Sequence, residues 1–310
     1  MLARPPRPSV TVPTVKVRIG FGVSGVAPID SHGFATLVDG LERTGFDSLW
    51  LSERIGAASF DPVTALAFAA GRSERIKFGT SVSVLPGRNP ADLAKQWATL
   101  ALLSNNRALP AFGLGVVHPN EQQAFGVRRN ERAARFDEML PLLRRIWTEE
   151  SVDHQGRFFQ YEGLRVAPKP PQPLDVWLGG KSSVELQRIG RLGDGWLASF
   201  AMPEQCANSR ATIEAAAAAA GRSIDPEHYG AMLFYSKGTL HDSVAALIAS
   251  RNPGVDPALL VPSTWQAVRT RVEEYVAVGF SKIVLVPFSA IDDWSTELPA
   301  GAEALLDLQT

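Results

Sequence analysis

The chain has 310 residues, of which 45% are hydrophobic and 20% are charged, and its formal net charge at pH 7 is -1. That length suits two ordinary domains or one large α/β barrel, because such barrels take about 250 residues. The near balance of charge removes the usual reason to expect a nucleic acid or an anionic membrane as a partner. A polyanion would need a local basic patch.

Cysteine usage and the N-terminus bear on location. Cys206 is the only cysteine, so the chain has neither an internal disulfide nor a cysteine zinc site, and we expect a reducing, cytoplasmic compartment and no bound metal. No apolar stretch approaches the roughly 20 residues of a membrane span. Residues 1–14 carry charge and proline without an apolar segment, and we expect a flexible arm there, followed by a single domain over 15–310.

Apolar runs of strand type alternate with helix-like stretches along nearly the whole chain, a pattern typical of parallel strands joined by helices. The predicted strands are 17–22, 46–51, 76–84, 108–115, 174–179, 195–199, 229–236 and 282–288. The predicted helices are 31–44, 62–72, 90–104, 131–148, 183–192, 203–220, 264–278 and 300–308. Eight such pairs predict an α/β fold with a single (β/α)8 TIM-type barrel, and a doubly wound open sheet is the alternative.

Two segments interrupt this alternation. Residues 151–173 carry short alternating runs around Gly156 and Gly163 and then a proline-rich stretch, which predicts a small hairpin inserted before the fifth strand. Residues 237–262 contain three prolines and predict a second insertion, after the seventh strand, with a short helix near 242–250. Because barrel enzymes place their chemistry on the loops that follow the strands, both insertions are candidates to cover a site.

The stretch WLGGKSS, residues 177–183, joins the predicted fifth strand to its helix. Gly179 and Gly180 have no side chains there, so a ligand can approach the backbone, and the amides at the start of the helix favour an anion. Lys181 adds a positive charge, and Ser182 can donate a hydroxyl or cap the helix. The alternative is a tight turn with an ordinary N-cap.

Five segments occur in the order and spacing of the luciferase-like monooxygenase superfamily. They are GFDSLWLSER (45–54), KFGTSVSVLPGRNPADLAKQWATLALLSNNR (77–107), AFGLGVVHPNEQQAFG (111–126), KPPQPLDVWLGGKS (169–182) and GRLGDGWLAS (190–199). The chain resembles in particular the branch of oxidoreductases that depend on the deazaflavin coenzyme F420, and the resemblance covers residues 17 to about 200.

The resemblance implies a barrel that binds flavin or deazaflavin at the carboxyl ends of its strands and passes hydride between F420 and a small organic substrate. It also suggests a homodimer. Three alternatives stay open: an FMN-dependent monooxygenase, a catalytically inactive flavin-binding barrel, and a phosphosugar isomerase or aldolase. The last would need a lysine at a strand end, where Lys237 is the one candidate.

The resemblance also implies a set of cofactor-binding residues. Gly179, Gly180, Lys181 and Ser182 would receive the cofactor's phosphate or its phosphate-bearing tail, and Ser81 and Val82 match the position of a non-proline cis peptide bond behind the ring. For the last two residues the alternative is an ordinary buried strand. We also expect Trp177 and Trp50 beside the ring, although core packing is the default for a tryptophan. Arg54, Arg188 and Arg191 are candidates to line a cationic groove for the tail.

Acid and base candidates lie at the ends of the second and fourth strands. The deazaflavin branch frequently has Asp-His at the second, where this chain has Glu53 and Arg54. Since a guanidinium does not release its proton, either Arg54 acts as a cation near the cofactor or proton transfer falls to Glu53; an ion pair between the two is the alternative. After the fourth strand, His118 is the other candidate general acid or base, and Asn120 can hydrogen-bond the ring. Glu121 could instead cap the next helix or pair with Arg128 or Arg129.

Overall fold

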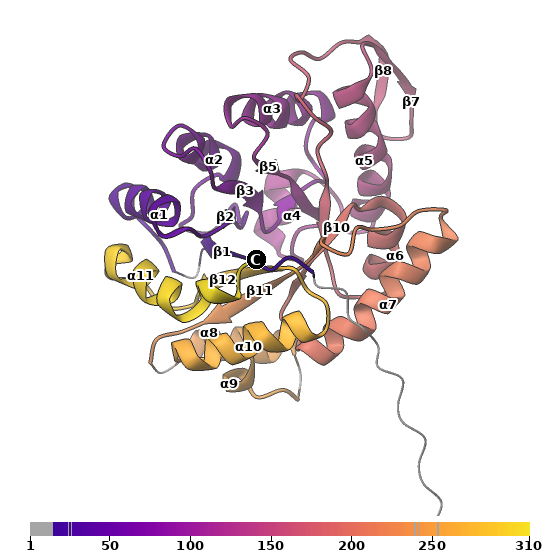
Figure 1. Cartoon of the computed structure of the whole chain (residues 1–310). Coiled ribbons are helices and arrows are strands. Elements are labelled where there is room, and N and C mark those ends of the chain that lie inside the picture. Colours follow the sequence, from indigo (N-terminus) through magenta and orange to yellow (C-terminus); the bar gives the residue numbers. More distant parts are fainter. Residues whose placement is uncertain (1–14, 24, 26, 239, 241, 253) are drawn as a thin grey trace, which may run out of the picture.

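The computed structural model describes residues 15–310 except residues 24, 26, 239, 241 and 253, so the predicted arm at 1–14 lies outside the described residues. One sheet of parallel strands forms the centre of the molecule (Figure 1). Its strands are β1 (Arg18–Val23), β2 (Ser48–Leu51), β3 (Lys77–Thr80), β4 (Ser83–Val84), β5 (Ala108–Leu109), β6 (Ala111–Gly113), β9 (Trp177–Gly179), β10 (Gly195–Ser199), β11 (Tyr229–Tyr235) and β12 (Lys282–Pro287).

The strand pairing closes the sheet into a barrel. The order is β4-β6-β9-β10-β11-β12-β1-β2-β3-β5, and every neighbouring pair is parallel. Only Ser81 and Val82 separate β3 from β4, and only Pro110 separates β5 from β6. The β3–β5 pair at one end of this order and the β4–β6 pair at the other are therefore two halves of one strand pair, and the predicted (β/α)8 barrel is confirmed.

The predicted strands 76–84 and 108–115 are each interrupted. The peptide bond between Ser81 and Val82 is cis, which breaks the first run between β3 and β4. Pro110 breaks the second, because proline has no N–H to donate to a neighbouring strand. Strand character in the sequence was therefore right, but the continuity of these two runs was wrong.

Helices surround the strands as an outer ring (Figure 1). They are α1 (Ser31–Thr44), α2 (Pro62–Ala70), α3 (Pro90–Leu103), α5 (Arg132–Thr148), α6 (Ser183–Leu192), α7 (Pro203–Ala219), α10 (Trp265–Ala277) and α11 (Trp294–Leu305). Side chains of short polar residues accept first-turn amides at many of their starts, as Asp30 does for α1 and Asn89 for α3. None of the described helices combines the length and the apolar composition that a membrane span needs.

The last helix differs from its prediction over 300–308. The α-helix begins at Trp294, where the Asp293 side chain accepts the Ser295 amide, and residues Leu306–Leu308 form a short 3-10 helix, η1, after it. Pro299 lies inside this helix. Proline usually ends a helix, and for that reason the sequence pattern placed the start too late.

The two predicted insertions have structure of their own. Residues 151–173 contain an antiparallel hairpin, β7 (Val152–Gln155) and β8 (Gln160–Leu164), whose His154 ring lies 3.1 Å from the Glu138 carboxylate on α5. Residues 237–262 contain α8 (Asp242–Arg251) and α9 (Pro257–Leu260). A further short helix that the sequence pattern did not predict, α4 (Pro119–Phe125), follows β6.

The apolar core has two parts. The larger part packs the outward-facing strand residues against the surrounding helices. The other fills the barrel with inward-facing residues, including Trp50, Trp177 and Leu197, and continues onto Val244 and Ile248 of α8. At the amino ends of the strands the buried Lys282 ammonium binds the Asp47 carboxylate inside the barrel. The interior is therefore a packed core, and in barrels of this kind ligands bind at the opposite, carboxyl rim.

Candidate active site

The loops after β2 and β3 meet at the carboxyl rim. The Ser81–Val82 bond is cis, as the resemblance implied. Ser52 holds this bend from the neighbouring strand end, because its hydroxyl lies 3.1 Å from both the Ser81 carbonyl oxygen and the Ser81 hydroxyl. The Glu53 amide donates to the Val82 carbonyl at 3.4 Å. The ends of the second and third strands are thus tied together around the cis bond.

The Val82 side chain points toward two glycines of neighbouring strands. A Cβ atom on Gly113 would lie 2.7 Å from Val82 Cγ2, and one on Gly179 would lie 3.1 Å from Val82 Cγ1. The absence of a side chain at Gly179 therefore makes room first for Val82, whereas the sequence pattern assigned that room to a ligand. Val82 itself is half-buried, so it presents an apolar surface at the rim.

Glu53 does not stand free as an acid or base. Its side chain is 3% exposed and pairs with the Arg88 guanidinium, and its other carboxylate oxygen accepts the Val84 amide at 2.7 Å. Burial disfavours the charged guanidinium and so lowers the pKa of Arg88, and the Glu53 carboxylate beside it favours the charged form. The carboxylate therefore holds the loop that follows β4, and a catalytic role for Glu53 stays a prediction. The alternative of a Glu53–Arg54 ion pair is wrong.

Arg54 pairs instead with Glu121 of α4. Arg54 Nε donates to Glu121 Oε1 at 3.2 Å, and the Arg54 side chain is 40% exposed whereas that of Glu121 is 4% exposed. Glu121 therefore does not cap a helix, and it does not pair with Arg128 or Arg129, the two alternatives that the sequence left open. The pair leaves a cation at the rim that is anchored from beneath by a buried carboxylate.

His118 and Asn120 lie at the start of α4. His118 is exposed, and its Nδ1 accepts the Asn120 amide at 3.3 Å as the N-cap of the helix. This bond uses the lone pair of Nδ1, so in the neutral ring the proton is on Nε2, which can donate a hydrogen bond to a ligand. Acid or base chemistry by this ring requires the cap bond to open. The Asn120 side chain lies over the loop after β2, where a Cβ on Gly56 would come within 2.9 Å of its Nδ2.

The start of α6 carries a complete capping box. Glu185 Oε2 accepts the amides of Lys181 at 3.1 Å and Ser182 at 3.0 Å, and the Ser182 hydroxyl accepts the Glu185 amide at 3.4 Å. Burial by itself raises the pKa of the Glu185 carboxyl, but these bonds bring it below its ordinary value. The N-cap alternative is therefore confirmed, and a carboxylate already occupies two of the amides that were expected to receive a phosphate.

Gly180 is shaped by the same carboxylate. Its φ is 152°, and a Cβ placed on it would lie 2.6 Å from the Glu185 Cβ. Its carbonyl accepts the Trp196 indole N–H at 3.0 Å. The next two amides, of the exposed residues Ser183 and Val184, belong to the first turn, where an α-helix has no internal acceptor for them.

Trp177, expected beside the cofactor ring, lies in the packed interior of the barrel. Its side chain is 2% exposed and begins β9, at the amino ends of the strands, with its ring 6.0 Å from that of Trp50 and 5.5 Å from that of His228. Gly195 and Gly230 lack side chains where this ring packs. Trp177 therefore fills the barrel at the end opposite the carboxyl rim, and Trp50, which is fully buried, packs beside it.

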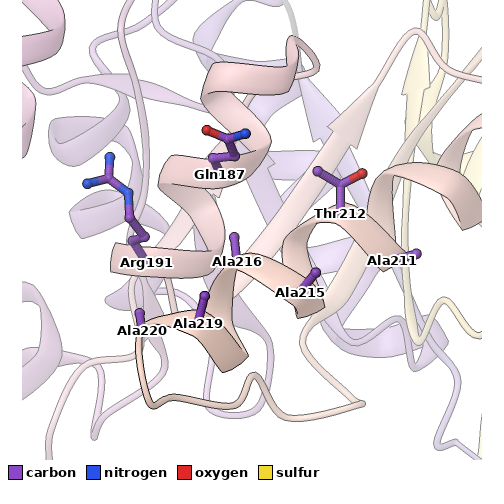
Figure 2. A pocket seen from close by; sticks show the side chains of 8 residues that line it. All are labelled: Gln187, Arg191, Ala211, Thr212, Ala215, Ala216, Ala219 and Ala220. Carbon is purple, nitrogen blue, oxygen red and sulfur yellow. The ribbon is translucent and has the colours of Figure 1, made fainter.

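The arginines expected to line a tail groove are engaged elsewhere. The Arg188 side chain is 7% exposed and donates to Asp137 at 2.5 Å, and Arg191 lies 3.8 Å from the same carboxylate. Arg191 and Gln187 of α6 instead face alanines of α7 across a hollow of about 730 Å³ on the outside of the barrel (Figure 2). Its lining is mostly small and apolar, so it offers little for an anionic tail to bind.

The sequence analysis did not predict the roles that four residues of the rim have in the structure: Arg88, Glu121, Arg132 and Glu185. Arg132 Nη1 donates to the carbonyl oxygens of Leu114, Gly115 and Val116, which fixes the loop after β6. Glu185 alone had a local signal, because Ser-x-x-Glu before an apolar run is a capping box. Among the described residues there is no cluster of His, Cys, Asp or Glu that could hold a metal ion.

Comparisons with solved structures agree with this architecture. An F420-dependent secondary alcohol dehydrogenase, solved with an F420-acetone adduct, has a TM-score of 0.80 at 18% identity over 95% of this chain and all of its own. The monooxygenase RslO1 from Streptomyces bottropensis has a TM-score of 0.77 at 22% identity over 94% of this chain and 99% of its own. At such identities the likeness concerns the fold.

Curated relatives are closer in sequence. An F420-dependent glucose-6-phosphate dehydrogenase of Amycolatopsis mediterranei is 31% identical over 169 residues, half of each chain. An F420-dependent hydroxymycolic acid dehydrogenase of Mycobacterium tuberculosis is 32% identical over 200 residues, 61% of this chain and 54% of its own. The match thus spans about half the length of these relatives. The family model described as luciferase-like monooxygenase matches residues 15–249, more than half of the chain, and the chain therefore belongs to the luciferase-like monooxygenase family.

Proposed function

We propose that this protein is an F420-dependent oxidoreductase that transfers hydride between the deazaflavin and a small organic substrate. The observation that carries the proposal is the carboxyl rim at the ends of β2 and β3, which the Glu53–Val82 backbone bond ties together and which carries the half-buried apolar Val82 and the partly exposed cation Arg54. Sequence relatives that are named as F420-dependent dehydrogenases support the choice of cofactor. When bound, the deazaflavin would supply the hydride chemistry, and the protein supplies binding and orientation.

The residues present fit such a cofactor with one change from the sequence-based site. Val82 would support the flat ring, with Ser81 held behind it by Ser52. Since Glu185 occupies the amides of Lys181 and Ser182, the phosphate would bind to the following amides, of Ser183 and Val184, with Lys181 as the neighbouring charge. His118 remains the predicted general acid or base, since the Glu53 carboxylate is paired with Arg88 and accepts the Val84 amide.

The alternatives are separated by different observations. A phosphosugar isomerase or aldolase would need a free amine at a strand end, but the Lys237 ammonium pairs with the buried Glu297 carboxylate, which also accepts the Tyr235 hydroxyl at 2.9 Å. An FMN-dependent monooxygenase and an inactive flavin-binding barrel share the same rim, and binding and turnover experiments must distinguish them. The cytoplasmic location inferred from the lone cysteine stays a prediction.

Equilibrium binding to F420 and to FMN tests the proposal directly. We expect F420 to bind at least about tenfold more tightly than FMN, a difference of about 1.4 kcal/mol. Quenching of F420 fluorescence on titration with protein measures the first constant, and FMN fluorescence measures the second. Tighter binding of FMN would make the monooxygenase the better assignment, and tight F420 binding without turnover on any alcohol or ketone tried would favour the inactive barrel.

Substituting Glu185 by glutamine tests the position of the phosphate. The amide side chain can still accept hydrogen bonds from the cap but carries no negative charge next to the incoming anion. We expect F420 to bind about two- to fivefold more tightly, since a charge at a helix end is worth about 0.3–1 kcal/mol. Glu204→Gln, which removes an exposed first-turn carboxylate of α7, is the matched control and should leave the affinity unchanged. An unchanged affinity in Glu185→Gln would place the phosphate elsewhere.

We also propose that the protein forms a homodimer through the outer faces of α2 and α3. Phe68 of α2 is 48% exposed, and Leu102 and Leu103 of α3 are 51% and 69% exposed. α2 and α3 are neighbours, so these exposed apolar side chains suit an interaction surface. Light scattering should give twice the 33.5 kDa chain mass for the wild type and a shift toward the monomer for Leu103→Lys. Leu259→Lys, at another exposed leucine on α9, should remain dimeric; a monomeric wild type would contradict the proposal.

A further inference from the structure

Glu121 has a second carboxylate oxygen that the Arg54 pair does not use. The side chain is 4% exposed, and Oε1 accepts from Arg54 Nε at 3.2 Å. Oε2 is buried and has no hydrogen-bond partner among the residues that the structure describes. A buried carboxylate oxygen without a partner is costly, and such groups in native proteins usually bind an ordered water or an ion.

Arg132 has an unpaired atom of the opposite kind. Its Nη1 donates to three carbonyl oxygens of the loop after β6, of which the Gly115 oxygen is nearest at 2.8 Å. Its Nε is buried, and within the described part of the chain it too has no hydrogen-bond partner. A donor and an acceptor are therefore both left over in the same region of the rim.

The side chains that carry these two atoms line the same small cavity. Glu121 and Arg132 both line it, together with apolar side chains that include Val84, Phe125 and Val127. Its volume is about 10 Å³, which is about the space that a single water molecule requires. An organic ligand is too large for it, and the Arg132 guanidinium disfavours a metal cation.

We propose that this cavity is a binding site for one buried water molecule, which donates to Glu121 Oε2 and accepts from Arg132 Nε–H. With both carboxylate oxygens engaged, the Glu121 side chain is fixed, and it is the positioning residue for Arg54. The bridge also ties α4 to the loop that Arg132 holds. The effect on the cofactor rests on the proposed function, because Arg54 would meet F420 at the rim, whereas the water site does not depend on it.

A high-resolution crystal structure of the ligand-free wild type tests the water site. We expect an ordered water peak within hydrogen-bond distance of both Glu121 Oε2 and Arg132 Nε, and no such peak in Glu121→Leu. A direct Glu121–Arg132 contact, or a cavity without density in the wild type, would overturn this part of the proposal. The experiment needs no cofactor, so its result is independent of the F420 assignment.

A double-mutant cycle on F420 affinity tests the positioning role. Glu121→Gln should weaken F420 binding about five- to tenfold, and in an Arg54→Ala background the same change should have little further effect, because contacting residues are not additive. Glu131→Gln is the control. It removes the N-cap carboxylate of α5, which lies 3.7 Å from Arg135 Nε, and this variant should bind F420 like the wild type. Additive losses, or an unaffected Glu121→Gln, would show that Glu121 does not act through Arg54. Failure of the wild type to bind F420 would count against the proposed function, and the crystallographic water would still decide the site.

Discussion

Replacing Asp47 by alanine is expected to lower the free energy of unfolding by about 3–5 kcal/mol, because it removes one partner of a buried ion pair. Asp47 and Lys282 bind each other at the amino ends of the strands, and the Lys282 side chain is 5% exposed. Burial, only partly offset by Asp47, lowers the pKa of Lys282 to about 8. Without Asp47 the ammonium would stand inside the barrel with no carboxylate beside it.

Urea denaturation followed by tryptophan fluorescence measures this loss, and the double variant Asp47→Leu with Lys282→Met provides the control. Because both charges are then absent, we expect the double variant to recover most of the stability, as buried pairs replaced by apolar residues often do. If the single variant loses less than about 1 kcal/mol, the pair is not desolvated as the structure describes.

The pH dependence has a definite sign. Lys282 has a folded pKa of about 8 against 10.5 for an ordinary lysine, so between these values the unfolded chain binds the proton that the folded chain has released. Stability attributable to Lys282 therefore rises with pH across that window and is constant below it. Asp47→Ala removes a group that raises the pKa of Lys282, so its folded form should lose this proton at a lower pH than the wild type does. The deficit of the variant should therefore shrink as the pH rises toward about 8 and stay constant above it.

The second large effect is expected at Glu53. Glu53→Ala removes the acceptor of the Val84 amide and the partner of Arg88 in one step, at a site where the carboxylate is 3% exposed. We expect a loss of about 3 kcal/mol or more in the free energy of unfolding, together with weakened F420 binding, because the loop after the cis bond loses its anchor. Glu53→Gln, which can still accept from Val84, should lose less.

Glu149→Ala supplies the matched control, because Glu149 also pairs with an arginine, Arg145 at 2.8 Å, but on the exposed surface of α5. Its removal should lower the free energy of unfolding much less than the removal of Glu53 does, because solvent screens an exposed ion pair. A Glu53→Gln protein with wild-type stability and an altered pH profile of turnover would contradict the anchoring role and restore Glu53 as an acid or base.

Much of the barrel could be predicted from local patterns, and the exceptions have specific causes. Continuous apolar runs identified the buried parallel strands because both of their faces are covered. The break at Ser81–Val82 has no local signature in a run of β-branched and small residues, so only the resemblance implied it. α4 was missed because its seven residues lie between a strand end and a glycine and show no apolar period.

The candidate site was harder to predict because its residues interact across long separations. Glu53 was expected to act by itself or with its neighbour Arg54, but the structure pairs it with Arg88 and pairs Arg54 with Glu121. Each partner comes from a different strand-end loop. Trp177 illustrates a related difficulty. The alternation of side chains along a strand predicts that a residue points into the barrel, but it does not tell whether the residue lies near the amino or the carboxyl end of the barrel.

By itself the sequence determined that strands and helices alternate into one barrel, that Ser182 can cap the helix after the fifth strand, and that the chain resembles deazaflavin-dependent enzymes. These features depend on hydrogen bonds and apolar periodicity within a few residues. Only the tertiary structure decided which carboxylate meets which guanidinium and that Val82 fills the space beside Gly179. The physical reason is that burial makes charged and hydrogen-bonding groups take whichever partner the folded loops bring within reach, and sequence distance says nothing about that choice.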